Sequence, residues 1–123
     1  MKRDMDLIRA ILLDIETRKS AYERWDAETF FKGKDVAVVV EHLNLLIKAN
    51  FLTGKAIYSP QENTCSLFGI DLTWNGHEFL SLSRENHVWE IAKKKIIDAG
   101  LAFSMPLLME CLKNIAKKYL NFN

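Results

Sequence analysis

The residues in this sequence that are best suited to metal binding or catalysis are three histidines and two cysteines, the side chains that most often bind zinc. His77 precedes Glu78, but no second histidine follows four residues later, as a zinc-binding helix requires. His42 and His87 stand at no ligand spacing from His77, and Cys65 and Cys111 lie too far apart for a Cys-x-x-Cys motif. The sequence therefore predicts no metal site, no cofactor, and two reduced, buried cysteines.

Motifs for covalent or phosphoryl-transfer chemistry are also missing from the sequence. All 5 glycines are isolated, so there is no glycine-rich phosphate loop, and there is no Gly-x-Ser-x-Gly nucleophile elbow. Serine, aspartate and histidine all occur, but a catalytic triad is defined by geometry and not by composition. We therefore expect a non-enzymatic protein without catalytic residues and without a small-molecule substrate.

One asparagine and several lysines would suit contact with double-stranded DNA. Asn44 offers an amide that pairs with adenine in the major groove, and Lys48 offers a cation for a phosphate. Glu41, His42, Asn44 and Lys48 are expected on the outward face of one helix. The predicted nucleic-acid-binding residues are Lys32, Lys34, Asn44, Lys48 and Lys55.

The charge distribution counts against DNA binding. The chain has 17 Lys and Arg against 16 Asp and Glu, a formal charge of +1, whereas proteins that bind nucleic acid mainly through charge are strongly basic. Residues 35–72 contain more acidic than basic side chains. A solvated helix surface is therefore the alternative interpretation of Asn44 and Lys48.

Two apolar residues point to a protein partner instead. Val38 and Leu45 are seven positions apart and lie off the main apolar stripe of their helix, so they predict a second apolar face and a partner-binding site. The alternative is that residues 20–34 or the C-terminal helix cover this face. The last helix would likewise pair with a second copy in a homodimer or pack on its own domain.

A set of lysines and two tryptophans are expected to have structural rather than binding roles. The run Lys93-Lys94-Lys95, together with Lys113, Lys117 and Lys118, is typical of a solvated helix face rather than of a site for an acidic partner. Trp74 and Trp89 lie beside apolar residues, which favours core positions over base stacking.

The periodicity of apolar residues predicts the elements that position these side chains. Helices are expected over about 5–19 behind Asp4, over 35–50 behind Asp35, after Thr73 or Asn75, from Asn86 to Gly100, and from Ser104 and Pro106 towards the C-terminus. A strand over 36–40 is the alternative for the valine run. A β-hairpin is expected from 51–58 and 64–72, with a bulge at Phe68-Gly69, while residues 20–34 have no firm assignment.

The order helix, helix, hairpin, helix is that of a winged-helix domain. EHLNLLIKANFL, then a hairpin and LTWNGHEFL, resembles the corresponding winged-helix segment. Together with MKRDMDLIRAILLDIE and the later Arg84 and Trp89, these blocks resemble the bacterial and prophage-associated family called domain of unknown function 2513. The resemblance implies a winged-helix-like fold and a mobile-element setting, and it implies no chemistry. It is weakest over residues 20–34, where a complete helix-turn-helix has a support helix.

These observations predict an α+β, winged-helix-like single domain over residues 1–123, with a core over 1–85 and a C-terminal helical pair over 86–123. The 49% hydrophobic content excludes a disordered chain, and no uncharged apolar run is long enough for a signal peptide or a membrane helix. We therefore expect a cytoplasmic protein.

The predicted function is a small phage or prophage regulator that binds double-stranded DNA. The alternative is a module that binds a host or phage protein, or a second copy of itself.

Overall fold

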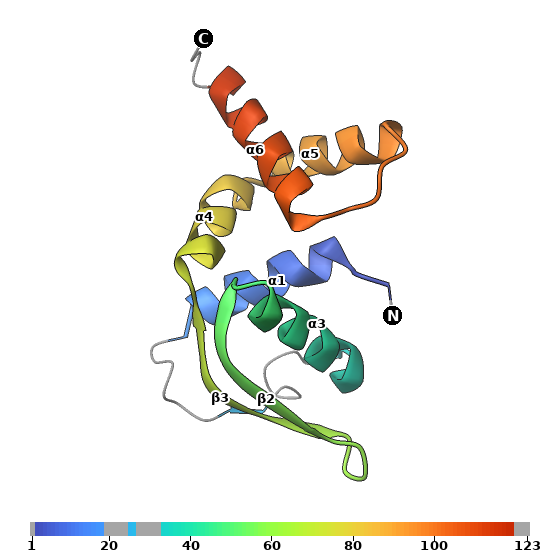
Figure 1. Ribbon diagram of the computed structural model, residues 1–123, viewed down its shortest axis with the longest axis vertical. Coiled ribbons are helices and arrows are strands. Elements are labelled where there is room, and N and C mark those ends of the chain that lie inside the picture. The colour runs from blue at the N-terminus through green and yellow to red at the C-terminus, as the bar shows by residue number, and fades with distance from the viewer. Residues whose placement is uncertain (1, 19–24, 27–32, 120–123) are drawn as a thin grey trace. The chain divides into compact units, whose positions relative to one another are not determined.

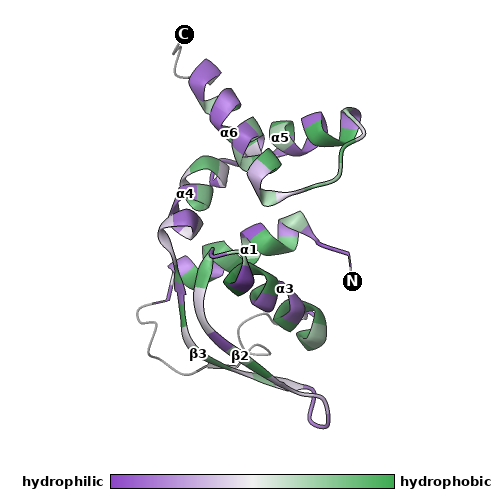
Figure 2. Cartoon of the chain, viewed as in Figure 1, coloured by the Kyte–Doolittle hydropathy of each residue, from purple (hydrophilic) through white to green (hydrophobic). Residues whose placement is uncertain are grey.

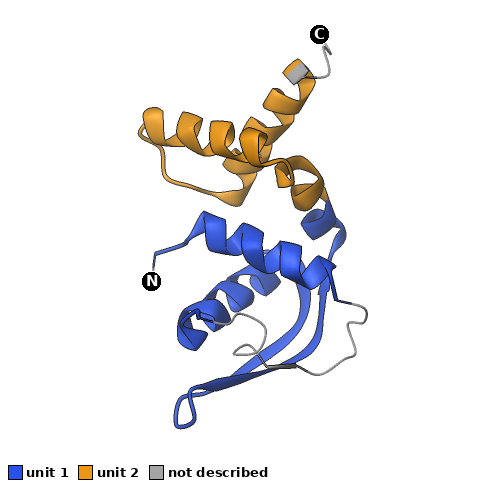
Figure 3. Ribbon diagram, turned by 180° about the vertical axis from the view of Figure 1, so that it is seen from behind, with its two compact units in different colours: residues 1–77 blue, residues 78–123 orange. Residues whose placement is uncertain are grey.

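The computed structural model describes residues 2–18, 25–26 and 33–119. The chain divides into two compact units, residues 1–77 and residues 78–123 (Figure 3). The division falls inside helix α4 (Trp74–Ser83), earlier than the predicted start of the C-terminal pair at residue 86.

The first helix, α1 (Met5–Glu16), begins and ends on local hydrogen bonds. The Asp4 carboxylate accepts from the backbone N–H of Leu7, so the predicted N-cap is confirmed. The helix ends earlier than predicted, because the Thr17 hydroxyl and backbone N–H both donate to the carbonyl of Asp14. Arg18 lies beyond the helix and pairs with Asp14 at 3.5 Å, and Lys19 lies outside the described residues.

The second described helix, α3 (Val36–Lys48), is also capped as predicted, since the Asp35 carboxylate accepts from the N–H of Ala37 at 3.0 Å. The alternative of a strand over residues 36–40 is wrong. Burial of apolar side chains on one helix face outweighs the lower helix propensity of valine. The buried apolar residues of α3 are Val36, Val39, Val40, Leu43 and Leu46.

The sheet of the first unit has three antiparallel strands in the order β1-β3-β2. The predicted hairpin is confirmed as β2 (Leu52–Ser59) and β3 (Thr64–Leu72). A two-residue strand, β1 (Trp25–Asp26), pairs with β3 opposite Leu67 and Ser66 and was not predicted. Helices α1 and α3 both contact β3, and α3 also contacts β2, beside which it lies in Figure 1.

The predicted bulge is present in β3. Thr53 pairs with Asp71 and Lys55 pairs with Phe68, so two residues of β3 stand opposite the single residue Gly54. Gly54 and Gly69 both have positive φ, at 106° and 60°. The extra residue shifts by one position the alternation of inward-facing and outward-facing side chains along β3. The buried positions of β3 accordingly run Cys65, Leu67, Ile70 and Leu72.

Helix α4 starts directly against the turn between α3 and β2. Thr73, and not Asn75, caps it: the Thr73 hydroxyl accepts from the N–H of Gly76 at 3.1 Å and donates to the carbonyl of Asn50 at 2.6 Å. A Cβ on Gly76 would overlap the carbonyl oxygen of Phe51. The glycine therefore permits the first turn of α4 to lie against the backbone of this connection.

The second unit contains the rest of α4 with α5 (Asn86–Asp98) and α6 (Met105–Tyr119). Glu85, one residue before the predicted cap, accepts from the N–H of Val88. Gly100 ends α5 with φ of 70°, as predicted, and the Ser104 hydroxyl caps α6. Figure 2 shows both hydrophilic and hydrophobic bands along α5 and α6.

The core of the second unit is built around a pair of aromatic rings. Phe79 and Trp89 meet edge to face with their centroids 5.8 Å apart. Apolar side chains from α4, α5 and α6 complete this core: Leu80, Ala92, Ile96, Leu108, Leu112 and Ile115. Across the described ranges, no helix combines the length and the apolar character needed to cross a membrane.

Candidate binding surface on helix α3

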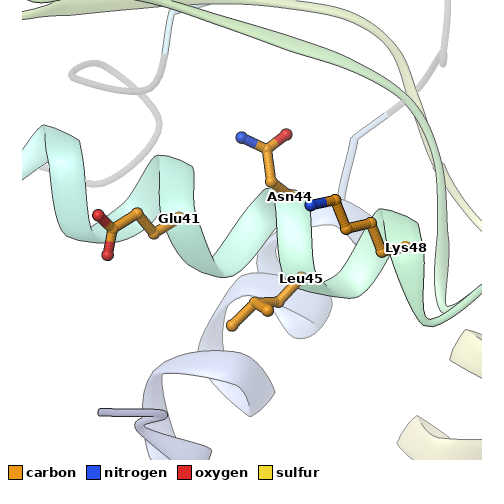
Figure 4. Close-up of a pocket in the computed structure, with 4 residues that line it drawn as sticks. All are labelled: Glu41, Asn44, Leu45 and Lys48. Atoms are coloured by element: carbon orange, nitrogen blue, oxygen red, sulfur yellow. The ribbon is translucent and has the colours of Figure 1, made fainter. Parts of the chain in front are cut away.

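An open pocket of about 300 Å³ lies on the outward side of α3. The described residues that line it are Glu41, Asn44, Leu45 and Lys48 (Figure 4). Residues three and four positions apart are neighbours on a helix surface, which is why one helix brings all four together. We call these four residues the α3 pocket.

The α3 pocket combines four different chemical groups. Glu41 is a hydrogen-bond acceptor with a negative charge, Asn44 both donates and accepts, Lys48 is a cation, and Leu45 is apolar. Glu41 and Lys48 are two turns apart, about 10 Å along the axis, which is too far for an ion pair. Within the described ranges, the side chains of Glu41, Asn44 and Lys48 have neither a hydrogen-bond nor an ion-pair partner. These three exposed polar groups are therefore available to a ligand.

The predicted DNA-binding residues are only partly brought together. Asn44 and Lys48 share the pocket. Lys34 is exposed but precedes the opposite end of α3, and the 13 residues of that helix span about 20 Å. Lys55 is exposed on β2, opposite Phe68, and Lys32 lies outside the described residues.

The two predicted partner-binding residues differ in exposure. Val38 is 36% exposed, while Leu45 is half-buried and lines the pocket. In Figure 4 the side chain of Leu45 extends to a different side of α3 from that of Asn44. The second apolar face of α3 is therefore present, with Val38 as its exposed member.

His42 does not belong to the outward face, and the expectation that it does is wrong. Its side chain is fully buried, with Nδ1 2.8 Å from the carbonyl oxygen of Val38 and Nε2 3.0 Å from the backbone nitrogen of Asp4. The sequence does carry a signal for this position, because residue 42 lies between Val39 and Leu46 at helical spacing. Its polarity favours the surface, but its helical spacing places it on the buried face of α3.

The tryptophans are also split between two environments. Trp89 is 1% exposed, as expected, whereas Trp74 is 77% exposed, so its assignment to the core is wrong. Trp74 is the first residue of α4, where the close approach of Gly76 to Phe51 sets the direction of the helix. Its exposure follows from this long-range contact, which the neighbouring apolar residues do not reveal.

Two of the three lysines in the run on α5 have intrahelical acidic partners. Lys93 pairs with Glu90 at 3.2 Å, and its Nζ lies 5.8 Å from the ring centroid of Trp89. Lys94 pairs with Asp98 at 2.8 Å, and the hydrogen bond and charge of that carboxylate raise the pKa of Lys94 above its usual 10.5. Lys94 thus lies on a solvated helix face, as predicted, whereas the side chain of Lys93 is only 15% exposed and lies over the ring of Trp89.

The potential metal ligands are not gathered into a site. Cys65 is buried, Cys111 is half-buried rather than buried, and both are free thiols. In the ranges that the structure describes, no three side chains of His, Cys, Asp or Glu come together as a metal site would need.

The fold is α+β, and the sequence places the chain in a known family. The family model described as "Hypothetical protein (DUF2513)" matches residues 2–102. The chain therefore belongs to the domain of unknown function 2513 family. An "Uncharacterized protein" of Haemophilus influenzae is 34% identical over 120 residues, which cover 98% of this chain and 99% of that relative. No solved structure matches the chain.

Proposed function

We propose that this protein is a small, non-enzymatic regulator whose first unit is a winged-helix-like domain that binds double-stranded DNA. The observation that carries the proposal is the placement of α3. This helix directly precedes the β2–β3 hairpin, and its outer face presents Asn44 and Lys48 in one pocket. A recognition helix followed by a hairpin wing has this order. A short strand β1, paired with the second hairpin strand, supports the same assignment.

The lysines around this surface support backbone contact with DNA. Lys34, Lys48 and Lys55 are exposed and, in the described part of the chain, have no acidic partner. Each would neutralise one phosphate, and Asn44 would pair with adenine in the major groove. Such a regulator acts where bacterial DNA lies, in the cytoplasm, and the family resemblance supports a phage or prophage setting.

The proposal is tested by fluorescence anisotropy of a labelled mixed-sequence duplex at about 50 and about 200 mM salt. Three phosphate contacts give a logarithmic salt slope of about −2.7, so the affinity should fall about 40-fold between these concentrations. Lys48→Glu should weaken binding to about the same extent on every duplex sequence. It should also reduce the steepness of the logarithmic salt slope by about 1, the contribution of one phosphate contact.

Lys113→Glu is the matched control, because Lys113 is an exposed lysine of α6 in the second unit. Its reversal should leave the affinity close to that of the wild type. Absence of duplex binding at the lower salt would refute the proposal. Loss of binding in Lys113→Glu but not in Lys48→Glu would indicate that the DNA-binding site lies in the second unit.

Protein binding is a second candidate, favoured by two specific observations. Val38 is an exposed valine on the same helix as the half-buried Leu45, and the pocket contains one acid as well as one base. Mixed charge around apolar residues suits a protein surface better than a phosphate backbone. The partner would be a second copy of the chain or a host or phage protein.

Light scattering tests the homodimer, because Val38→Asp should convert a dimeric mass to a monomeric one. Leu45→Asp should act in the same way, and any loss of thermal stability would measure how far Leu45 belongs to the core. Capture from a host lysate, with wild type and Val38→Asp in parallel, tests a foreign protein partner. A monomeric mass together with identical captured proteins would remove this candidate.

A further inference from the structure

Glu41 is the residue of the α3 pocket that fits phosphate binding least. It is exposed, it lies one turn before Asn44, and it has no partner in the described part of the chain. A carboxylate near a DNA backbone repels the phosphates. A carboxylate that points at the base edges has a different role, because it only accepts hydrogen bonds.

In the major groove, the N4 amino group of cytosine is the donor that a carboxylate side chain recognises, while an asparagine amide pairs with N6 and N7 of adenine. Three helical residues advance about 4.5 Å, and consecutive bases of one strand are spaced about 3.4 Å. Glu41 and Asn44 are therefore spaced to meet neighbouring bases.

Lys48 completes this chemistry. It follows Asn44 by one turn, where a phosphate contact would fix the register of the helix. Leu45 extends to a different side of α3 from Asn44 and takes no part in this contact. Glu41, Asn44 and Lys48 thus correspond to three different features of a DNA groove.

On the basis of the function proposed above, we propose that Glu41 is a specificity-determining residue. It accepts a hydrogen bond from the amino group of cytosine, next to an adenine that Asn44 reads. The ligand is then double-stranded DNA that presents cytosine and adenine at neighbouring positions in the major groove. The negative charge of Glu41 lowers the affinity for all other sequences.

The test is selection from a random duplex pool with the wild type, Glu41→Gln and Glu62→Gln, followed by anisotropy on the selected duplex and its single-base variants. Glu62 is an exposed acid in the turn between β2 and β3 and is the control for loss of one charge. The wild type should prefer cytosine at one position by about fivefold or more.

Glu41→Gln should change that preference to adenine, because an amide pairs with adenine, and Glu62→Gln should keep the preference for cytosine. A wild type that binds duplex DNA in a salt-dependent way, but without cytosine enrichment, would overturn this inference and leave the proposed function standing. Enrichment that Glu41→Gln does not change would also overturn it. Absence of duplex binding would overturn both.

Discussion

The backbone N–H of Asp4 donates a hydrogen bond of 3.0 Å to Nε2 of His42, a residue 38 positions later in the chain. Because Nε2 accepts this bond, the ring hydrogen is on Nδ1, which donates to the carbonyl of Val38. The imidazole therefore links the start of α1 to the middle of α3. A buried histidine with both ring nitrogens bonded holds the two helices in one relative position.

Replacement of His42 by phenylalanine should destabilise the protein, although phenylalanine is the more apolar residue. The substitution leaves the N–H of Asp4 without its acceptor, which costs about 1–3 kcal/mol. Urea denaturation followed by circular dichroism measures the change. Asn44→Ala, on the exposed side of the same helix, is the control and should stay within about 0.5 kcal/mol of the wild type. Equal stability of the two variants would contradict the linking role of His42.

Gly76→Ala should destabilise the protein against the usual trend for helices. In a helix interior this change normally stabilises by about 0.5–1 kcal/mol. Here the new Cβ meets the carbonyl oxygen of Phe51, and such overpacking costs about 1–3 kcal/mol. The melting temperature should fall, whereas Asn75→Ala at the adjacent exposed position should change it little. A higher melting temperature for Gly76→Ala would show that α4 does not lie against this carbonyl.

The two tryptophans provide a matched pair of substitutions. Trp89→Ala removes the ring that packs on Phe79 and should cost about 3–5 kcal/mol. Trp74→Ala removes a side chain that is 77% exposed and should change stability by less than about 0.5 kcal/mol. Chemical denaturation checks both. A large loss of stability in Trp74→Ala would show that the side chain of Trp74 is buried in the core in solution.

Lys94 supplies a prediction about pH. Asp98 raises the pKa of Lys94 by its hydrogen bond first and by its charge second, so the side chain should titrate above 10.5 in the folded protein. A raised lysine pKa stabilises the fold below the unfolded value, and this contribution is lost as the pH rises through the folded value. NMR titration of the Lys94 side chain should show a lower pKa in Asp98→Asn. An unchanged pKa would mean that the pair is not formed in solution.

The elements that could be predicted from sequence are those determined by neighbouring residues. The caps at Asp4 and Asp35 and the left-handed Gly100 depend on hydrogen bonds and torsions within a single turn. Strand β1 could not be predicted in this way, because two residues pair with a strand that follows much later. The exposure of Trp74 also depends on a contact between distant segments, whereas the burial of His42 could have been predicted from its helical spacing to Val39 and Leu46.

The same distinction applies to the candidate site. Helical spacing alone brings Asn44, Leu45 and Lys48 together, so the centre of the site could be predicted from the sequence. The positions of Lys34 and Lys55 relative to that centre depend on how the helix and the hairpin are arranged. The outward position of Glu41 also follows from helical spacing alone.

The bulge opposite Gly54 also limits how the gene can change. Leu67 and Ile70 are three positions apart and both buried, so β3 can turn both inward only if the extra residue forms a bulge. In this bulge the carbonyl oxygen of Gly69 lies 2.6 Å from the position that a Cβ on Gly54 would occupy. Family members with the same strand length should therefore keep glycine at position 54, and accept insertions and deletions at residues 60–63 in the turn.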